Sequence, residues 1–104
     1  MNIDEFQKQV IDAFTQMAKA KNQNLHTQKE TYIHLVEEIG EIARQITNET
    51  RRPEKFDKEN LGEELADAMM FIVYLANQYD IDISSKMKSS IEKLNLKAKF
   101  SQSK

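Results

Sequence analysis

The sequence predicts an all-α fold. Its 104 residues include only two glycines and one proline, and runs of Glu, Lys, Gln, Leu, Ile and Ala favour helices over strands. At 39% hydrophobic residues, a chain of this length forms one small domain, residues 1–104, with little core to spare. We therefore expect a four-helix, antiparallel, bundle-like fold that oligomerisation completes.

The first two helices follow from apolar residues that recur at steps of three and four. The first is expected from Ile3 to Lys21, and the polar segment Asn22 to Thr27 follows as a loop. The second is expected to end near Asn48, because Pro53 disfavours helix in the residue before it. Its apolar stripe consists of Tyr32, Leu35, Ile39, Ile42 and Ile46.

A connection of about eight to ten residues leads to a third helix, which suits an antiparallel hairpin. The stripe of this helix consists of Leu61, Leu65, Ala68, Ile72, Leu75 and Tyr79. Asp80 to Asp82 closes it, and Ser84 or Ser85 is expected to cap a fourth helix. The apolar face of the fourth helix consists of Ile83, Met87, Ile91, Leu94 and Ala98, and the final SQSK is expected to fray.

Two pairs of acidic residues lie beside these stripes: Glu38 with Glu41, and Glu64 with Asp67. Each acid directly precedes a residue of its helix's apolar stripe, so all four lie on the same flank of their stripes. When two antiparallel helices pack along such stripes, equivalent flanks lie on the same side of the helix pair, and the four carboxylates are expected to converge there. Converging carboxylates repel one another and lose solvation, which a hard cation would offset. Oxygen ligands without His or Cys predict Mg²⁺, Mn²⁺ or Ca²⁺. The alternative is that these acids only solvate helix faces.

A glycine lies between the acids of the first pair. Glycine inside a helix costs on the order of 1 kcal/mol relative to alanine. Gly40 therefore predicts close approach of a backbone or a ligand at this position.

Composition excludes several functions. The chain has no cysteine, so a disulfide framework and a thiolate metal site are impossible and a reducing cytoplasm is expected. The net charge of −2 argues against binding of nucleic-acid polymers. The start of the chain lacks the pattern of a signal peptide, and no stretch approaches membrane-spanning length, so we expect no membrane association. Charge is uneven along the chain: eleven acids oppose five bases from Glu30 to Asp67, and six lysines oppose Glu92 from Lys86 to Lys104.

The motif Glu37-Glu38-Ile39-Gly40-Glu41, followed by Glu64-Leu65-Ala66-Asp67, resembles the EExxE…ExxD signature of the MazG family of nucleoside triphosphate pyrophosphohydrolases. The resemblance extends from Tyr32 to Phe100. It implies the all-α fold class of dimeric dUTPases and phosphoribosyl-ATP pyrophosphatases, dependence on Mg²⁺, and assembly into homodimers or homotetramers. The family pattern makes Glu38, Glu41, Glu64 and Asp67 the metal ligands. Glu37 would orient water or a second ion, or is simply exposed.

The same resemblance implies phosphate-binding residues near the end of the fourth helix. Lys93 and Lys97 lie one turn apart there and could meet a triphosphate together. The spacing from Lys93 to Phe100 departs from other forms of the family motif. The alternative is a basic last turn that favours the helix dipole.

Further substrate contacts are expected near the acids. His34 lies one turn before Glu38, where it would touch a phosphate or remain exposed. Tyr74 or Phe71 would stack on a base or pack in the core. Asn77 would read a base edge or cap the helix.

The predicted function is Mg²⁺-dependent hydrolysis of (deoxy)nucleoside triphosphates to monophosphate and pyrophosphate, by attack of a metal-activated water on the α-phosphoryl group. Glu38 or Glu37 would take the proton. Nucleotide-pool house-cleaning is one expected role. Two alternatives stay open: a narrower substrate, such as dUTP, dCTP or phosphoribosyl-ATP, and a non-catalytic metal-binding helical interaction module.

Overall fold

The computed structural model describes residues 1–102 and confirms the all-α class. Those residues form four α-helices and one 3-10 helix, without a strand. The elements are α1 (Ile3–Ala20), α2 (Gln28–Arg51), η1 (Pro53–Lys55), α3 (Lys58–Gln78) and α4 (Ile83–Gln102). Of the expected frayed end, residues 101 and 102 are helical, and residues 103 and 104 lie outside the described residues.

Side-chain caps fix where all four α-helices begin, and those of α2 and α4 bear on the sequence expectations. Thr27 forms a capping box with Glu30: its hydroxyl accepts from the Glu30 N–H at 3.2 Å, and the Glu30 carboxylate accepts from the Thr27 N–H at 3.0 Å. At α4 the carboxylate of Asp82 accepts from the Ser85 N–H at 3.2 Å. The expectation of a Ser84 or Ser85 cap is therefore wrong, because the stronger carboxylate acceptor lies directly before the first helical residue.

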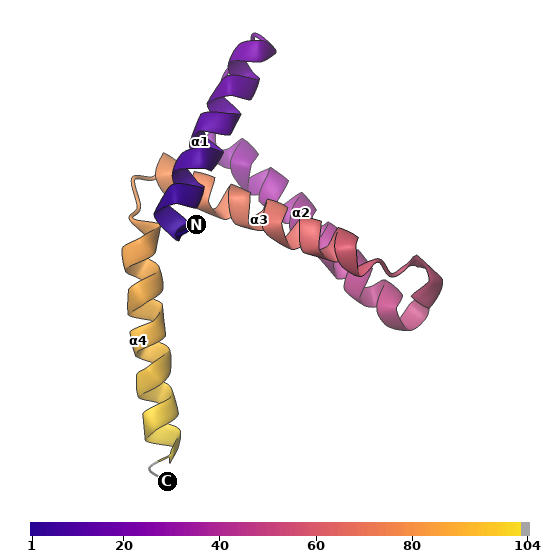
Figure 1. The fold of residues 1–104 in the computed structure, drawn as a ribbon, viewed down its shortest axis with the longest axis vertical. Helices are drawn as coiled ribbons and strands as arrows, with labels where there is room; N and C mark the ends of the chain where they lie inside the picture. The colour runs from indigo at the N-terminus through magenta and orange to yellow at the C-terminus, as the bar shows by residue number, and fades with distance from the viewer. Residues whose placement is uncertain (103–104) are drawn as a thin grey trace.

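Helices α2 and α3 lie side by side as an antiparallel hairpin (Figure 1). Polar contacts join them at both ends. At one end the Gln78 side chain donates to the His26 carbonyl at 2.8 Å, and at the other the Gln45 side chain accepts from the Asp57 N–H at 3.0 Å. These contacts fix the register of the pair, and with it the positions at which acids of α2 face acids of α3.

The face that α2 turns to α3 is rotated from the apolar stripe. Tyr32, Ile39 and Ile46 of that stripe are 57%, 53% and 56% exposed, whereas Thr31 and Gln45 are buried. The apolar surface of α2 is therefore wider than the area that α3 covers. The contact between the two helices is displaced toward the flank of α2 that carries the acids.

Helix α3 shows the same displacement. Leu65 and Ile72 are 48% and 44% exposed, whereas Glu64 and Ala68 are buried. The hairpin thus buries part of its acidic flank, whereas Ile39 and Ile46 of the α2 stripe and Leu65 and Ile72 of the α3 stripe stay about half exposed within residues 1–102.

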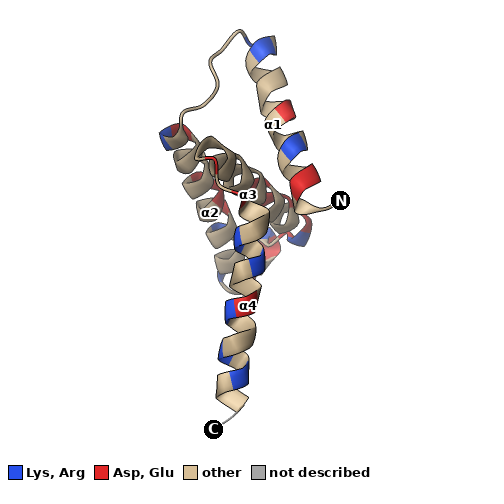
Figure 2. Ribbon diagram, turned by 90° about the vertical axis from the view of Figure 1, so that its left-hand side faces the viewer, with Lys and Arg blue, Asp and Glu red and all other residues tan. Residues whose placement is uncertain are grey.

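The remaining helices leave the hairpin in different directions (Figures 1 and 2). Helix α1 packs on α3 through a small core of Val10, Val73 and Tyr74, and the Gln7 side chain donates to the Val73 carbonyl at 2.9 Å. Helix α4 projects away and buries none of its residues. Its exposed apolar side chains include Met87, Ile91, Leu94, Leu96 and Phe100. None of the helices within residues 1–102 combines the length and apolar character that crossing a bilayer requires.

Candidate functional site

The two acidic pairs influence one another across the hairpin. Burial raises the pKa of Glu38 above its ordinary value, and Asp67, Glu64, Glu41 and Glu37 raise it further, in that order. Two of these four acids come from α3. Acids of both helices therefore lie close enough to Glu38 to act on its carboxylate.

Glu64 is the most buried acid of the group, at 8% exposed. One oxygen, Oε1, accepts from the Asn60 side-chain amide at 3.1 Å, while Oε2 is buried without a hydrogen-bond partner. A buried carboxylate oxygen without a partner is energetically unfavourable, and a cation would remove that cost. The donor set of carboxylate oxygens suits a hard divalent ion.

The carboxylates are not drawn together as a finished ligand cage. No three His, Cys, Asp or Glu side chains within residues 1–102 are grouped so that they could hold one ion. Glu41 instead pairs with Arg44, its Oε1 lying 3.6 Å from Nη2, and Glu37 Oε2 lies 3.9 Å from Nδ1 of His34. The ligand set Glu38, Glu41, Glu64 and Asp67 therefore stays a prediction, and it requires side-chain rotation on binding.

No close approach occurs at Gly40 within the described chain. A Cβ added at this glycine would meet nothing within 4 Å, and the residue is exposed. The expectation that a neighbouring backbone packs there is wrong for a single copy, because this side of α2 is open.

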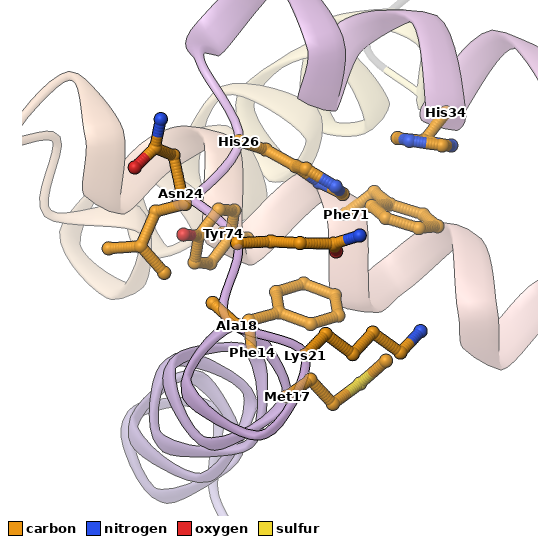
Figure 3. A pocket seen from close by; sticks show the side chains of 11 residues that line it. Phe14, Met17, Ala18, Lys21, Asn24, His26, His34, Phe71 and Tyr74 are labelled. Atoms are coloured by element: carbon orange, nitrogen blue, oxygen red, sulfur yellow. The ribbon is translucent and has the colours of Figure 1, made fainter.

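A cavity of about 300 Å³ lies between α1, the loop after it, and the hairpin (Figure 3). Aromatic and imidazole rings from all of these segments line it, together with polar side chains of the loop. The rings belong to Phe14, His26, His34, Phe71 and Tyr74. This size and this combination of apolar and polar groups are typical of small-molecule sites.

The rings are packed against one another. Phe14 stacks on Phe71 with centroids 5.7 Å apart and meets Tyr74 edge-on at 4.7 Å. His34 stacks on His26 at 4.8 Å and on Phe71 at 5.5 Å. Burial raises the pKa of Tyr74, so its hydroxyl stays neutral at physiological pH.

The structure groups only some of the predicted substrate residues. His34 and Tyr74 line the cavity. Asn77 is exposed and does not line it, and Lys93 and Lys97 are exposed on the projecting α4. The structure does not bring these last three to the acids, and their roles stay predictions.

Two lining groups were missed by the sequence interpretation. In the sequence, Phe14 is one of several apolar residues on a helix face, and His26 is part of a polar loop. Their shared cavity depends on how α1 crosses α3, which no short-range pattern encodes. The one available signal is a second histidine close in sequence to His34.

Comparison with known proteins places these features in a family. Residues 26–99 match the model of the MazG nucleotide pyrophosphohydrolase domain. The matched stretch includes all four acids and most of α4, but not α1, so the Phe14 wall of the cavity lies outside it. No curated protein and no solved structure matches the chain.

Proposed function

This chain belongs to the MazG nucleotide pyrophosphohydrolase domain family, and on that premise we propose that it hydrolyses nucleoside triphosphates to monophosphate and pyrophosphate with Mg²⁺ or Mn²⁺. One observation carries the proposal: acids of both helices act on the carboxylate of Glu38, which lies one turn of α2 from His34, a lining residue of the ring-lined cavity. Metal ligands and a nucleoside pocket are the two parts that such a reaction needs.

The acids Glu38, Glu41, Glu64 and Asp67 would hold the cation. When bound, the ion neutralises phosphate charge and lowers the pKa of a coordinated water. The buried Oε2 of Glu64 has no other partner, which favours its use as a ligand. Rotation of Glu41 away from Arg44 would bring a further oxygen to the site.

The reaction would proceed by attack of water oxygen on the α-phosphorus. The bond to the bridging oxygen breaks, and pyrophosphate leaves with the electron pair. Glu38 or the exposed Glu37 takes the proton of the attacking water.

The nucleoside would occupy the ring-lined cavity. His34 precedes Glu38 by one turn of α2, and Phe71 follows Asp67 by one turn of α3, so a base stacked here places its α-phosphate near the acids. Stacking on rings tolerates many bases, which suits house-cleaning of a nucleotide pool. Asn24 in the loop offers hydrogen bonds that would restrict the choice of base.

A second copy of the chain would complete the fold as a homodimer or homotetramer. No residue of α4 is fully buried, and Ile39, Ile46, Leu65 and Ile72 of the α2 and α3 stripes are about half exposed within residues 1–102. The lysines of α4 complement the acids of the hairpin in charge (Figure 2). Lys93 and Lys97 lie away from the acids of their own chain, so we expect them to reach a triphosphate held by a partner copy. A reducing cytoplasm suits a chain without cysteine.

A substrate panel tests the reaction. Canonical and modified triphosphates, dUTP, dCTP and phosphoribosyl-ATP are incubated with protein and Mg²⁺, and monophosphate and pyrophosphate are quantified. Glu38→Gln and Asp67→Asn should abolish pyrophosphate release while helicity by circular dichroism stays intact. The exposed neighbour Glu63 supplies the matched control, Glu63→Gln.

Two results would contradict the proposed function. Activity that survives in both variants would remove the acids from the reaction. Mg²⁺ binding that a non-hydrolysable nucleotide never affects, in a protein that turns over no triphosphate, would favour a metal-binding interaction module instead.

A further inference from the structure

A second cavity lies at the far end of α2 from the ring-lined one. Its volume is about 630 Å³, and its lining residues are Arg44, Thr47, Asn48, Arg51, Arg52 and Lys55. The chain has three arginines, and all three line this cavity. The planar guanidinium fork matches phosphate oxygens in pairs, which an ammonium group does not. We call these four cations and the two polar residues the arginine corner.

The charge of the arginine corner is largely uncompensated. Among the described residues, the ion pair that these cations make is that of Arg44 with Glu41, at 3.6 Å. Its lining includes no acid. The turn after α2 contributes to the cluster: the Lys55 N–H donates to the Arg52 carbonyl at 2.8 Å, which folds η1 back beside the last turn of the helix.

The arginine corner lies on the same side of α2 as the proposed site, farther toward the C-terminal end of the helix. Arg44 lies one turn beyond Glu41, and Asn48 and Arg51 follow at steps of four and three along the same side of α2. One turn corresponds to about 5 Å along the axis. The same side of the helix therefore carries, in order, a wall of the nucleoside cavity at His34, the acids, and the arginine corner.

We propose that the arginine corner binds the β- and γ-phosphates of the substrate and the pyrophosphate that leaves. The assignment rests on the proposed function. When the bond between the α-phosphorus and the bridging oxygen breaks, negative charge grows on the departing pyrophosphate, and guanidinium groups beside it stabilise that charge. Glu41 and Arg44 would exchange partners: the carboxylate turns to the cation, and the freed guanidinium turns to a phosphate.

Direct binding tests the site without catalysis. Inorganic pyrophosphate is titrated into the protein with EDTA present, so that divalent metal plays no part, and heat is measured by calorimetry. Arg51→Gln/Arg52→Gln should weaken affinity by about tenfold or more, since each charge-assisted contact is worth that order. The control Lys8→Gln/Lys19→Gln removes the same charge from exposed positions on α1 and should leave affinity unchanged.

Steady-state kinetics distinguishes phosphate binding by Arg51 and Arg52 from a purely structural role of these residues at the end of α2. In Arg51→Gln/Arg52→Gln the KM for triphosphate should rise, and inhibition by pyrophosphate should weaken in parallel. Arg51→Lys/Arg52→Lys should recover only part of the lost affinity for triphosphate and pyrophosphate. A lower melting temperature with unchanged KM and unchanged pyrophosphate affinity would overturn the proposal.

Two other outcomes are distinguishable. Pyrophosphate that binds with unchanged affinity when a non-hydrolysable triphosphate saturates the protein would show a separate polyphosphate site and overturn the assignment to the substrate. A wild type that binds pyrophosphate at the arginine corner but hydrolyses no triphosphate would instead overturn the proposed function and leave the anion site standing.

Discussion

The rings of His34 and Phe71 lie nearly parallel, with centroids 5.5 Å apart and 15° between their planes. Each ring belongs to a helix that also carries an acidic pair, and each lies one turn from an acid of that pair, Glu38 in α2 and Asp67 in α3. The stacked pair therefore occupies the junction between the cavity and the acids.

Phe14→Leu should raise the KM for triphosphate by roughly tenfold with little change in kcat. The substitution keeps apolar volume but removes the ring of the α1 wall, and base–aromatic stacking is worth on the order of 1–3 kcal/mol. Steady-state kinetics provides the measurement. Phe6→Leu on the same helix is the control, because Phe6 packs on the core and not on the cavity. An equal rise in KM for both variants would make the effect one of α1 packing.

Metal-free protein should lose stability as pH rises past the ordinary carboxyl pKa of 4.5. Glu38 has a raised pKa in the fold, so between these two values the folded state binds more protons than the unfolded state, and the free energy of unfolding falls with rising pH. Glu38→Gln should be more stable than the wild type above this window and lose the advantage below it. Melting curves in EDTA across the acidic range measure the difference.

With added Mg²⁺ the wild type should become more stable than Glu38→Gln. A bound cation stabilises the wild-type carboxylates, and the glutamine variant lacks one of the ligands. Glu63→Gln, which changes an exposed acid of α3, should melt like the wild type in both conditions. Identical pH profiles for wild type and Glu38→Gln would mean that the acids do not act on one another.

Periodicity predicts which residues share a face but not which partner covers it. Ile39 and Leu65 lie on the predicted stripes, yet both are about half exposed, because a wide apolar face accommodates a neighbour at more than one rotation. The influence of the α3 acids on Glu38 survives this rotation, since it depends only on antiparallel pairing and equal flanks. The cavity wall at Phe14 and the clustering of Arg52 with Lys55 arise from a helix crossing and a turn, and sequence spacing encodes neither.

Leu94→Glu should shift the protein toward monomer and lower its melting temperature, if a second copy covers α4. Leu94 is 61% exposed in one chain, so the substitution would be harmless without a partner. Sedimentation velocity measures the assembly state. Ser89→Glu adds the same charge on the opposite face of α4 and should leave assembly unchanged. Two variants that sediment like the wild type would contradict coverage of α4 by a partner.

Gly40→Ala should stabilise the protein by about 1 kcal/mol, because alanine is the better helix former and the added methyl group has open space around it. Gly62→Ala meets equally open space but lies in the first turns of α3, where the gain should be smaller. Chemical denaturation of both variants gives the comparison. If Gly40→Ala instead loses stability or dissociates the assembly while Gly62→Ala does not, the backbone of a second copy must pack against Gly40. The close approach predicted from the sequence would then exist between chains and not within one.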